Sequence, residues 1–354
     1  WQLTSRETVM RRKVKSLTLL IILLCFVLVL GYGGYRGYQY VEQIIAEAPD
    51  INEIDATPSG YMSTVLDAKG NVTAQLVGTG SNRVYVTLDE IPEELQKAFV
   101  AIEDERFYDH NGIDLRGIVR AGIKGVTTGH FSEGASTITQ QLLKNNVFDG
   151  WTTENSSQRV KRKLQEQYLA LQLEKKVSKD WIMENYLNTI NLGQNTLGVQ
   201  AASRRYFGKD VSELNLSECA VIAGITQNPS KYNPISHPED NAVRREKVLT
   251  NMRDQGYIDD VQYEAAMQDN VYDRIQETNT KWQSSDSNAT SYFVDALTEE
   301  IIDDLQKELD YSEAQAYKAL YSGGLTIYST QDPQIQEICD TQVNDDNNYN
   351  IEKK

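Results

Sequence analysis

Hydrophobic and polar positions divide the chain into stretches of different character. Residues 17–35 form an apolar run that no charged side chain interrupts. Two short segments with strand composition, Met62–Leu66 and Val72–Val77, flank the turn sequence Asp67–Asn71, so we expect a β hairpin there. From residue 92 to about residue 270, apolar residues recur at helical spacing. The pattern therefore predicts a mainly α-helical body after a hairpin and an apolar segment.

The apolar run over residues 17–35 is long enough to cross a membrane. About 19 residues at 1.5 Å each span roughly 28 Å, close to the hydrocarbon thickness of a bilayer. Residues 1–16 carry a net charge of +4, and a basic segment of this kind stays in the cytoplasm. A cleaved signal peptide is the alternative, but the run is long for one and no small-residue cleavage site follows it. We therefore expect an uncleaved single-pass anchor, with everything after it outside.

Towards the C-terminus the pattern changes again. Residues 278–291 are polar and rich in Ser, Asn and Thr, which predicts a linker. Residues 292–309 predict an amphipathic helix whose apolar stripe contains Phe293, Leu297, Ile301 and Leu305. After a Gly-Gly pair, Leu325–Thr330 is strand-like, and pairing with the hairpin is one arrangement open to it. Residues 341–354 predict a polar tail.

Composition and charge exclude several functions. The net charge of −16, or −20 after residue 16, argues against a nucleic-acid partner, because a phosphate backbone would repel such a chain. The cysteines Cys25, Cys219 and Cys339 lie far apart, so they predict neither a disulfide framework nor a zinc site. The sequence contains no Walker A loop and no Gly-x-Ser-x-Gly elbow. Carboxylates, a hydroxyl and amide cluster, and a basic patch remain as candidates for chemistry.

Glu103 is the first candidate. It ends the predicted helix that begins near Pro92, and the partial negative charge of a helix C-terminus disfavours a charged carboxylate. Apolar neighbours act in the same direction, so this side chain is suited to general base catalysis near neutral pH. A solvated acidic turn that also contains Asp104 and Glu105 is the alternative left open.

The second candidate is a segment that concentrates hydrogen-bond donors around a glycine. A glycine allows a ligand to approach the backbone closely, and such a cluster suits an oxygen-rich ligand. An ordinary helix with a Ser or Thr N-cap explains the composition equally well. The residues are Gly134, Ser136, Thr137, Gln140, Gln141 and Lys144.

The third candidate is a cationic helix face. Arg159, Arg162, Lys163 and Glu166 follow helical spacing and share one face. Phosphate is a natural partner, because arginine offers a planar fork and lysine a point charge. A solvated face or a lipid-headgroup contact is the alternative. The spacing also allows Glu166 to pair with Arg162 or Lys163 and orient them.

In this order the segments resemble the family 51 glycosyltransferase domain, the peptidoglycan polymerase module. The resemblance covers about residues 85–260 and is specific because the motifs occur together. The matching blocks are Glu103-Asp104…Phe107…His110…Gly112, then Gly134…Ser136-Thr137…Thr139-Gln140-Gln141…Lys144-Asn145, then Arg162-Lys163…Glu166, then Glu184…Tyr186-Leu187-Asn188…Gly193, and finally Gly198-Val199…Lys209 and Gln227-Asn228-Pro229…Tyr232-Asn233-Pro234.

The resemblance implies an architecture. It implies a mainly α, lysozyme-like, two-lobed glycosyltransferase domain over residues 89–270, after one transmembrane helix and a short β linker region over residues 60–88. Residues 292–340 resemble the start of the linker toward the transpeptidase domain of class A penicillin-binding proteins. The sequence has no Ser-x-x-Lys and no Lys-Thr-Gly. We therefore expect the first part of a bifunctional protein, without its transpeptidase nucleophile.

The resemblance also implies an activity at the outer face of a bacterial cell membrane. Lipid II would be polymerised into β-1,4 glycan strands with inversion, releasing undecaprenyl pyrophosphate from the donor glycan. Glu103 would deprotonate the acceptor hydroxyl, and Glu166 would orient cations or assist the leaving group. Magnesium or manganese beside the pyrophosphate and other cell-wall synthesis proteins would be partners. The substrate-binding residues would be Gly134, Ser136, Thr137, Gln140, Gln141, Lys144, Arg162 and Lys163.

Two other functions compete with this interpretation. A lysozyme-like hydrolase would use Glu103 and a second carboxylate, but it has little use for a phosphate-binding face. A non-catalytic membrane-anchored scaffold would not need Glu103 at all. For the apolar residues between 113 and 133 we expect either bilayer contact or ordinary core packing. They are Ile113, Leu115, Ile118, Val119, Ile123, Val126 and Phe131.

Overall fold

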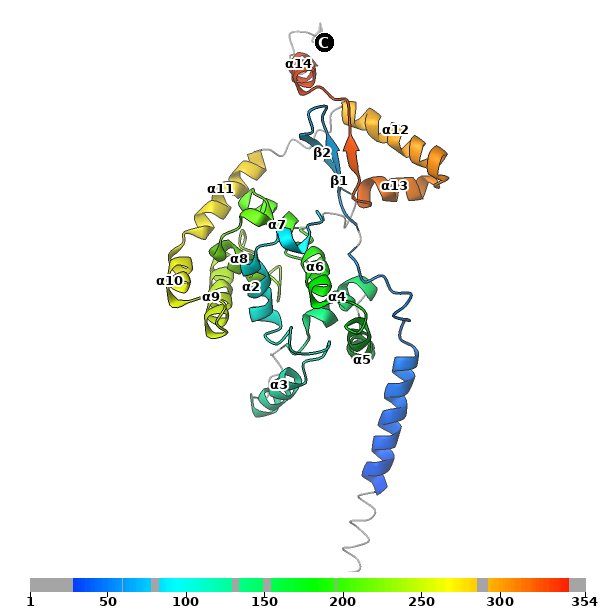
Figure 1. Ribbon diagram of the computed structural model, residues 1–354, viewed down its shortest axis with the longest axis vertical. Helices are drawn as coiled ribbons and strands as arrows, with labels where there is room; N and C mark the ends of the chain where they lie inside the picture. Colours follow the sequence, from blue (N-terminus) through cyan, green and yellow to red (C-terminus); the bar gives the residue numbers. More distant parts are fainter. Residues whose placement is uncertain are drawn as a thin grey trace, which may run out of the picture. The chain divides into compact units, whose positions relative to one another are not determined.

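The computed structural model describes residues 28–58, 60–77, 83–128, 134–148, 154–194, 196–284 and 292–343. The chain forms two compact units (Figure 1). One consists of Trp1–Ile54 with Gly150–Leu169, and the other of Asp55–Asp149 with Ala170–Lys354.

Two helices make up the described part of the first unit. A helix over residues 28–46 includes the end of the predicted anchor, whose residues 17–27 lie outside the described residues. Most of α5, Ser156–Leu173, belongs to the same unit. The Gln165 amide donates to the carbonyl oxygen of Ile44 at 3.0 Å and ties the two helices together. Within the described part of the chain, no helix combines the length and apolarity that a membrane span requires.

The predicted hairpin is present in the second unit. β1, Ser63–Leu66, pairs antiparallel with β2, Val72–Leu76. The Asp67 carboxylate accepts the backbone N–H groups of Lys69 and Asn71 at 2.8 and 2.9 Å, which closes the turn. β3, Thr326–Tyr328, then adds to β1 in parallel and gives the order β2-β1-β3. The expected strand after the Gly-Gly pair therefore pairs with the hairpin.

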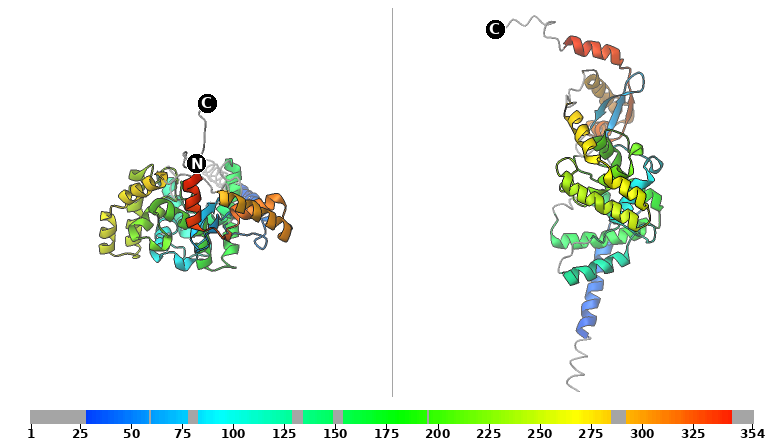
Figure 2. Two further views of the ribbon diagram at one scale, coloured as in Figure 1. Left: turned by 90° about the horizontal axis from the view of Figure 1, so that it is seen from above. Right: turned by 90° about the vertical axis from the view of Figure 1, so that its left-hand side faces the viewer.

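Two helices pack against this sheet. α12, Tyr292–Leu309, and α13, Glu313–Ser322, lie beside it in Figures 1 and 2. The predicted apolar stripe of α12 packs here, so that prediction is confirmed. α14, Pro333–Val343, follows the sheet. The buried core of this layer consists of Val65, Leu76, Val294, Ile302, Ala316 and Leu320.

The remaining elements are helical, so the mainly α prediction is confirmed. α8 is almost entirely buried, and both α2 and α9 pack against it. Two short 3-10 turns, η1 and η2, precede α2 and α8. The bounds are η1 Leu88–Glu90, α2 Glu93–Glu103, α3 Leu115–Thr128, α4 Ile138–Val147, α6 Lys179–Thr189, α7 Val199–Phe207, η2 Val211–Glu213, α8 Leu216–Gly224, α9 Pro238–Asp254, α10 Asp260–Gln268 and α11 Val271–Ser284.

Two predicted boundaries differ from the structure. α11 continues to Ser284 and takes up the first half of the linker predicted over residues 278–291. Polar contacts hold this segment, because the Arg205 guanidinium donates to the Asn279 side chain at 2.9 Å. Residues 285–291 lie outside the described residues. α14 likewise extends to Val343, into the predicted polar tail, whose remaining residues are not described.

Candidate active site

Glu103 is the last residue of α2. The helix begins after Pro92, and its C-terminal end is fixed by α9, because the Asn251 amide donates to the Ala101 carbonyl oxygen at 2.9 Å. At Asp104 the backbone leaves the helix with φ −155° and ψ 71°. The two neighbouring carboxylates therefore enter different surroundings: Asp104 is 6 % exposed, whereas Glu103 is only half-buried.

The Asp104 carboxylate is part of the scaffold. It accepts the backbone N–H of Ile138, at the start of α4, at 2.9 Å and the His110 imidazole at 3.0 Å. His110 Nδ1 accepts from the backbone N–H of Gly112 at 3.0 Å, so Nε2 carries the hydrogen that faces Asp104. These contacts join the end of α2 to the start of α4 and leave Glu103 as the accessible acid of the pair.

Glu103 is held from two sides. The Gln141 amide on α4 donates to Oε2 at 2.7 Å, and the Thr226 hydroxyl, just after α8, donates to Oε1. The Tyr186 hydroxyl lies 3.4 Å from the carbonyl oxygen of the Gln141 side chain. Burial raises the pKa of Tyr186 well above its usual range, so its hydroxyl keeps its proton and donates to Gln141.

Thr137 and Gln140 face the protein interior. The Thr137 side chain caps α4 by accepting the Gln140 N–H at 3.2 Å, and it donates to the Gly112 carbonyl oxygen at 2.8 Å. The Gln140 amide donates to the same carbonyl at 3.3 Å. Gly112 has φ +94°, and a Cβ there would lie 2.6 Å from the backbone of Ala170, so glycine is required. For Thr137 and Gln140 this geometry favours an ordinary capped helix over direct ligand binding.

The other members of the donor cluster are more accessible. Gly134 is exposed, and a Cβ placed on it would meet no heavy atom within 4 Å, so the backbone there is open to approach. Ser136 is half-buried in the segment before α4. Lys144 lies in the last turn of α4, where a cation complements the helix end. Gln141 is the member that the structure brings into contact with Glu103.

The cationic face on α5 lies in the other unit and is organised by two acids. Glu166 is fully buried, and its two oxygens bind the Arg162 guanidinium and, at 2.8 Å, the Lys163 ammonium. Glu154 binds Arg162 through two N–H groups, with the Nε contact at 2.9 Å. These hydrogen bonds lower the pKa of Glu154 and raise that of Arg162. Glu154 precedes α5, so helical periodicity gave no signal for it.

The described residues contain no group of three or more His, Cys, Asp or Glu side chains arranged to hold a metal ion. The Glu154 and Glu166 carboxylates are engaged by cations. A divalent cation beside a pyrophosphate would then depend mainly on phosphate oxygens and water, which is usual for magnesium.

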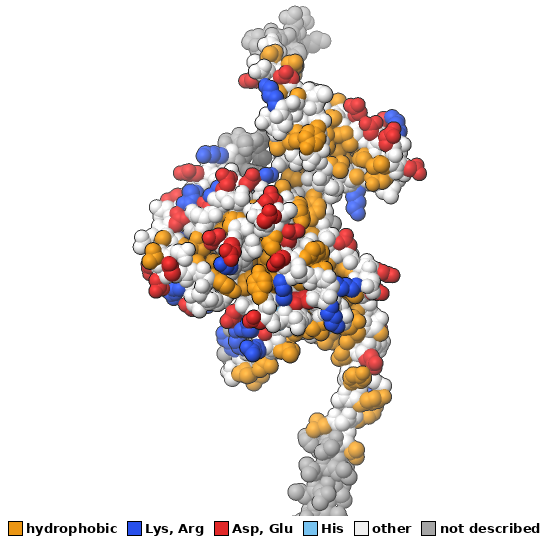
Figure 3. Space-filling view, in the orientation of Figure 1, with side chains coloured by type: hydrophobic (Ala, Val, Ile, Leu, Met, Phe, Trp, Pro, Cys, Tyr) orange, Lys and Arg blue, Asp and Glu red, His pale blue; other side chains and the backbone are white. Residues whose placement is uncertain are grey.

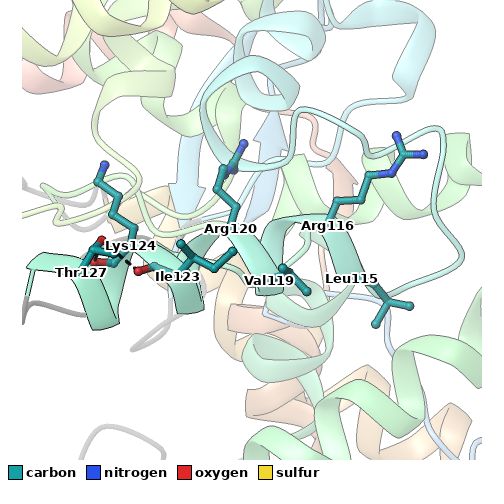
Figure 4. A pocket seen from close by; sticks show the side chains of 7 residues that line it. All are labelled: Leu115, Arg116, Val119, Arg120, Ile123, Lys124 and Thr127. Atoms are coloured by element: carbon teal, nitrogen blue, oxygen red, sulfur yellow. Dashed lines mark hydrogen bonds between the residues drawn. The ribbon is translucent and has the colours of Figure 1, made fainter.

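α3 carries an apolar face that the other described elements leave exposed. Leu115, Val119, Ile123 and Val126 are 60–79 % exposed, so core packing is wrong for these four. Figure 4 shows Arg116, Arg120 and Lys124 in a row along the helix beside the apolar row, and side chains of both rows line one shallow pocket. Figure 3 shows the basic side chains gathered over α3, with apolar side chains at its outer edge. Phe131 lies outside the described residues.

Comparison with known proteins identifies one family. The transglycosylase family matches residues 69–253. Penicillin-binding protein 1A of Clostridium perfringens strain 13 is 39 % identical over 327 residues, which cover 88 % of this chain and 46 % of that protein. Penicillin-binding protein 1A/1B of Bacillus subtilis is 36 % identical, covering 93 % of this chain and 34 % of the relative. The chain thus spans less than half the length of these relatives.

A solved structure is also similar. The crystal structure of penicillin-binding protein 1A from Haemophilus influenzae shares 21 % sequence identity, covering 80 % of this chain and 29 % of that one. The TM-score is 0.35, which is too low to support a conclusion about the fold.

Proposed function

Because this chain belongs to the transglycosylase family, we propose that it is a peptidoglycan glycosyltransferase that polymerises lipid II into β-1,4 glycan strands. The observation that carries the proposal is the carboxylate of Glu103, which is accessible and held by two donors. The neighbouring Asp104 is buried and fully used by the scaffold. The site therefore presents one oriented base.

The base acts on the sugar acceptor. Glu103 removes the proton of the acceptor 4-hydroxyl as that oxygen bonds to the anomeric carbon of the donor glycan. The bond from this carbon to the pyrophosphate breaks on the opposite face, and its electron pair leaves with undecaprenyl pyrophosphate. Attack and departure on opposite faces invert the anomeric configuration. The proton remains on Glu103 until solvent removes it.

Cations stabilise the leaving group, where negative charge accumulates. We assign this role to Arg162 and Lys163, with Lys144 as a third cation. Arg162 is already bound by two acids, whereas the side chain of Lys163 is 38 % exposed and so more accessible to phosphate. Glu166 is fully buried and binds both cations, which supports an orienting role. Gly134, Ser136 and Gln141 would hold sugar and phosphate oxygens, while Thr137 and Gln140 would shape the loop beside them.

Both substrates are lipid-linked, so the site must work at a membrane. We propose that residues 17–35 anchor the chain with its N-terminus in the cytoplasm. The exposed tyrosines of the helix over residues 28–46 suit the outer interface. The exposed apolar face of α3, with a row of cations beside it, suits contact with the bilayer surface. The lysozyme-like arrangement of two lobes around a cleft belongs to the same proposal.

The whole protein is expected to do more than this chain. The relatives that it matches are named penicillin-binding proteins, and the matched part covers only 46 % and 34 % of their length. We propose that the protein continues from the sheet and α14 into a transpeptidase domain, as in class A penicillin-binding proteins. Other cell-wall synthesis proteins as partners, and magnesium or manganese at the pyrophosphate, are part of the same proposal.

The nature of the product tests the proposal. The purified chain is given lipid II in detergent and, separately, finished glycan strands. We expect polymer from lipid II and no fragments from the glycan. Fragments from glycan without polymer from lipid II would establish the lysozyme-like hydrolase instead, and no reaction with either substrate would favour the scaffold.

A further inference from the structure

We propose that Thr226 is a positioning residue that holds the base in both of its protonation states and directs the proton to one oxygen of Glu103. The inference rests on the proposed function, in which Glu103 accepts a proton. It concerns a residue 123 positions away in the sequence, at the end of a different helix.

The fold places Thr226 firmly. α8 is buried along nearly its whole length and packs against α2, and Ile225, directly after it, is also fully buried. Thr226 comes next and is half-buried, with its hydroxyl against Glu103 Oε1. The same hydroxyl oxygen lies 3.1 Å from the carbonyl oxygen of Ala223, one of the last carbonyls of α8.

One hydroxyl hydrogen cannot serve both acceptors at once. While Glu103 is ionised, the hydrogen of Thr226 points to Oε1, because a hydrogen bond to a charged acceptor is the stronger one. Once Oε1 carries a proton, the new O–H donates to the Thr226 oxygen, and the Thr226 hydrogen turns to the Ala223 carbonyl. Both protonation states are thereby satisfied once the Thr226 hydroxyl and the new carboxylic O–H have each turned about a C–O bond.

The other oxygen of Glu103, Oε2, faces a partner that can donate a hydrogen bond but cannot accept one. The Gln141 amide that faces Oε2 is a donor only, and the buried Tyr186 hydroxyl occupies its carbonyl end. A proton on Oε2 would therefore face the Gln141 N–H, which cannot accept a hydrogen bond. The proton from the sugar hydroxyl is directed to Oε1, on the Thr226 side.

Removal of the hydroxyl tests the inference. Thr226→Val keeps the size of the side chain and removes the oxygen, whereas Thr226→Ser keeps the oxygen. We expect kcat for lipid II polymerisation to fall about tenfold to a hundredfold in Thr226→Val, the scale of a hydrogen bond to a charged group. KM of Thr226→Val should stay within about twofold, because the substitution removes no contact that binds substrate and transition state equally. Thr226→Ser should retain most of kcat.

Control variants separate this role from a structural one. Thr280 is exposed and its hydroxyl donates to the Gln276 carbonyl of its own helix, so Thr280→Val should leave kcat unchanged. In a Glu103→Gln background, Thr226→Val should lower the residual rate no further. If valine prevents folding, Thr226→Ala against Thr226→Ser differs by the same oxygen and repeats the comparison.

Each contrary result has a separate meaning. Wild-type kcat in Thr226→Val, equal impairment in Thr226→Ser, or a rise in KM alone would overturn the role of Thr226. The proposed function would survive these results if wild-type protein polymerises lipid II and Glu103→Gln does not. Absence of polymer with wild-type protein would instead overturn the function itself.

Discussion

Glu103 and Asp104 are chemically similar neighbours with different surroundings. The helix ends between them, so Asp104 turns inward to His110 and the N-terminus of α4, while Glu103 stays half-exposed between Gln141 and Thr226. At the scale of single residues this division leaves one acid in the scaffold and one accessible.

Stability should therefore respond to the two acids differently. Asp104→Ala leaves two buried donors without an acceptor, and we expect it to lower the free energy of unfolding by at least about 2 kcal/mol. Glu103→Gln keeps the shape of the side chain and should cost less than about 1 kcal/mol. Urea denaturation followed by circular dichroism measures both. Equal losses would mean that Glu103 belongs to the scaffold as well.

Tyr186 should make the protein sensitive to alkali. Its pKa in the folded state lies above the ordinary value of 10.0, chiefly because the ring is buried. The unfolded chain loses this proton at lower pH than the folded one, so stability is full below about pH 10 and falls as pH rises further. The free energy of unfolding, measured from pH 8 to 11, should decline less steeply in Tyr186→Phe. Parallel curves would show that Tyr186 is not the group involved.

Some residues of the candidate site could be predicted from the sequence, and others could not. Glu103, Gln141 and Glu166 could be proposed as site residues because helical spacing or a compact motif places them. Thr226 could not, because its contact with Glu103 arises only when α8 packs against α2. Helical spacing could not predict Glu154 either, because it precedes α5 and binds Arg162 on that helix.

At the scale of elements, α3 is an amphipathic helix whose apolar face is not covered by any described element. Four of its apolar residues are exposed, and a row of cations lies beside them (Figure 4). The sequence predicted the apolar spacing but left core packing and bilayer contact open, because periodicity does not say what covers a face. The structure excludes core packing for Leu115, Val119, Ile123 and Val126, because their side chains are exposed.

A tryptophan placed on α3 should report the bilayer. In proteoliposomes, Val119→Trp should gain fluorescence that brominated lipids quench, because position 119 lies on the apolar face. Val261→Trp on α10 is a matched control, since Val261 is 77 % exposed. Its added fluorescence should not be quenched. Equal quenching at both positions, or none at position 119, would show that the apolar face of α3 does not contact the membrane.

At the scale of the molecule, pairing between distant segments was the least predictable feature. The hairpin followed from its turn residues, whereas the neighbour of β1 on its other side comes from residues 326–328. Turn chemistry fixes a local register, but nothing local selects a strand some 260 residues away. Glu103 and the cationic cluster on α5 likewise belong to different compact units, so the proposed site residues come from distant segments of the chain.

The central claim is that Glu103 is the base of lipid II polymerisation. The most direct test compares wild-type chain with Glu103→Gln at equal concentration on lipid II, after urea denaturation has shown both to be folded. A general base contributes typically about 10²–10⁴-fold, so the variant should lose at least a hundredfold in kcat. A folded Glu103→Gln protein that polymerises lipid II at the wild-type rate would contradict the account.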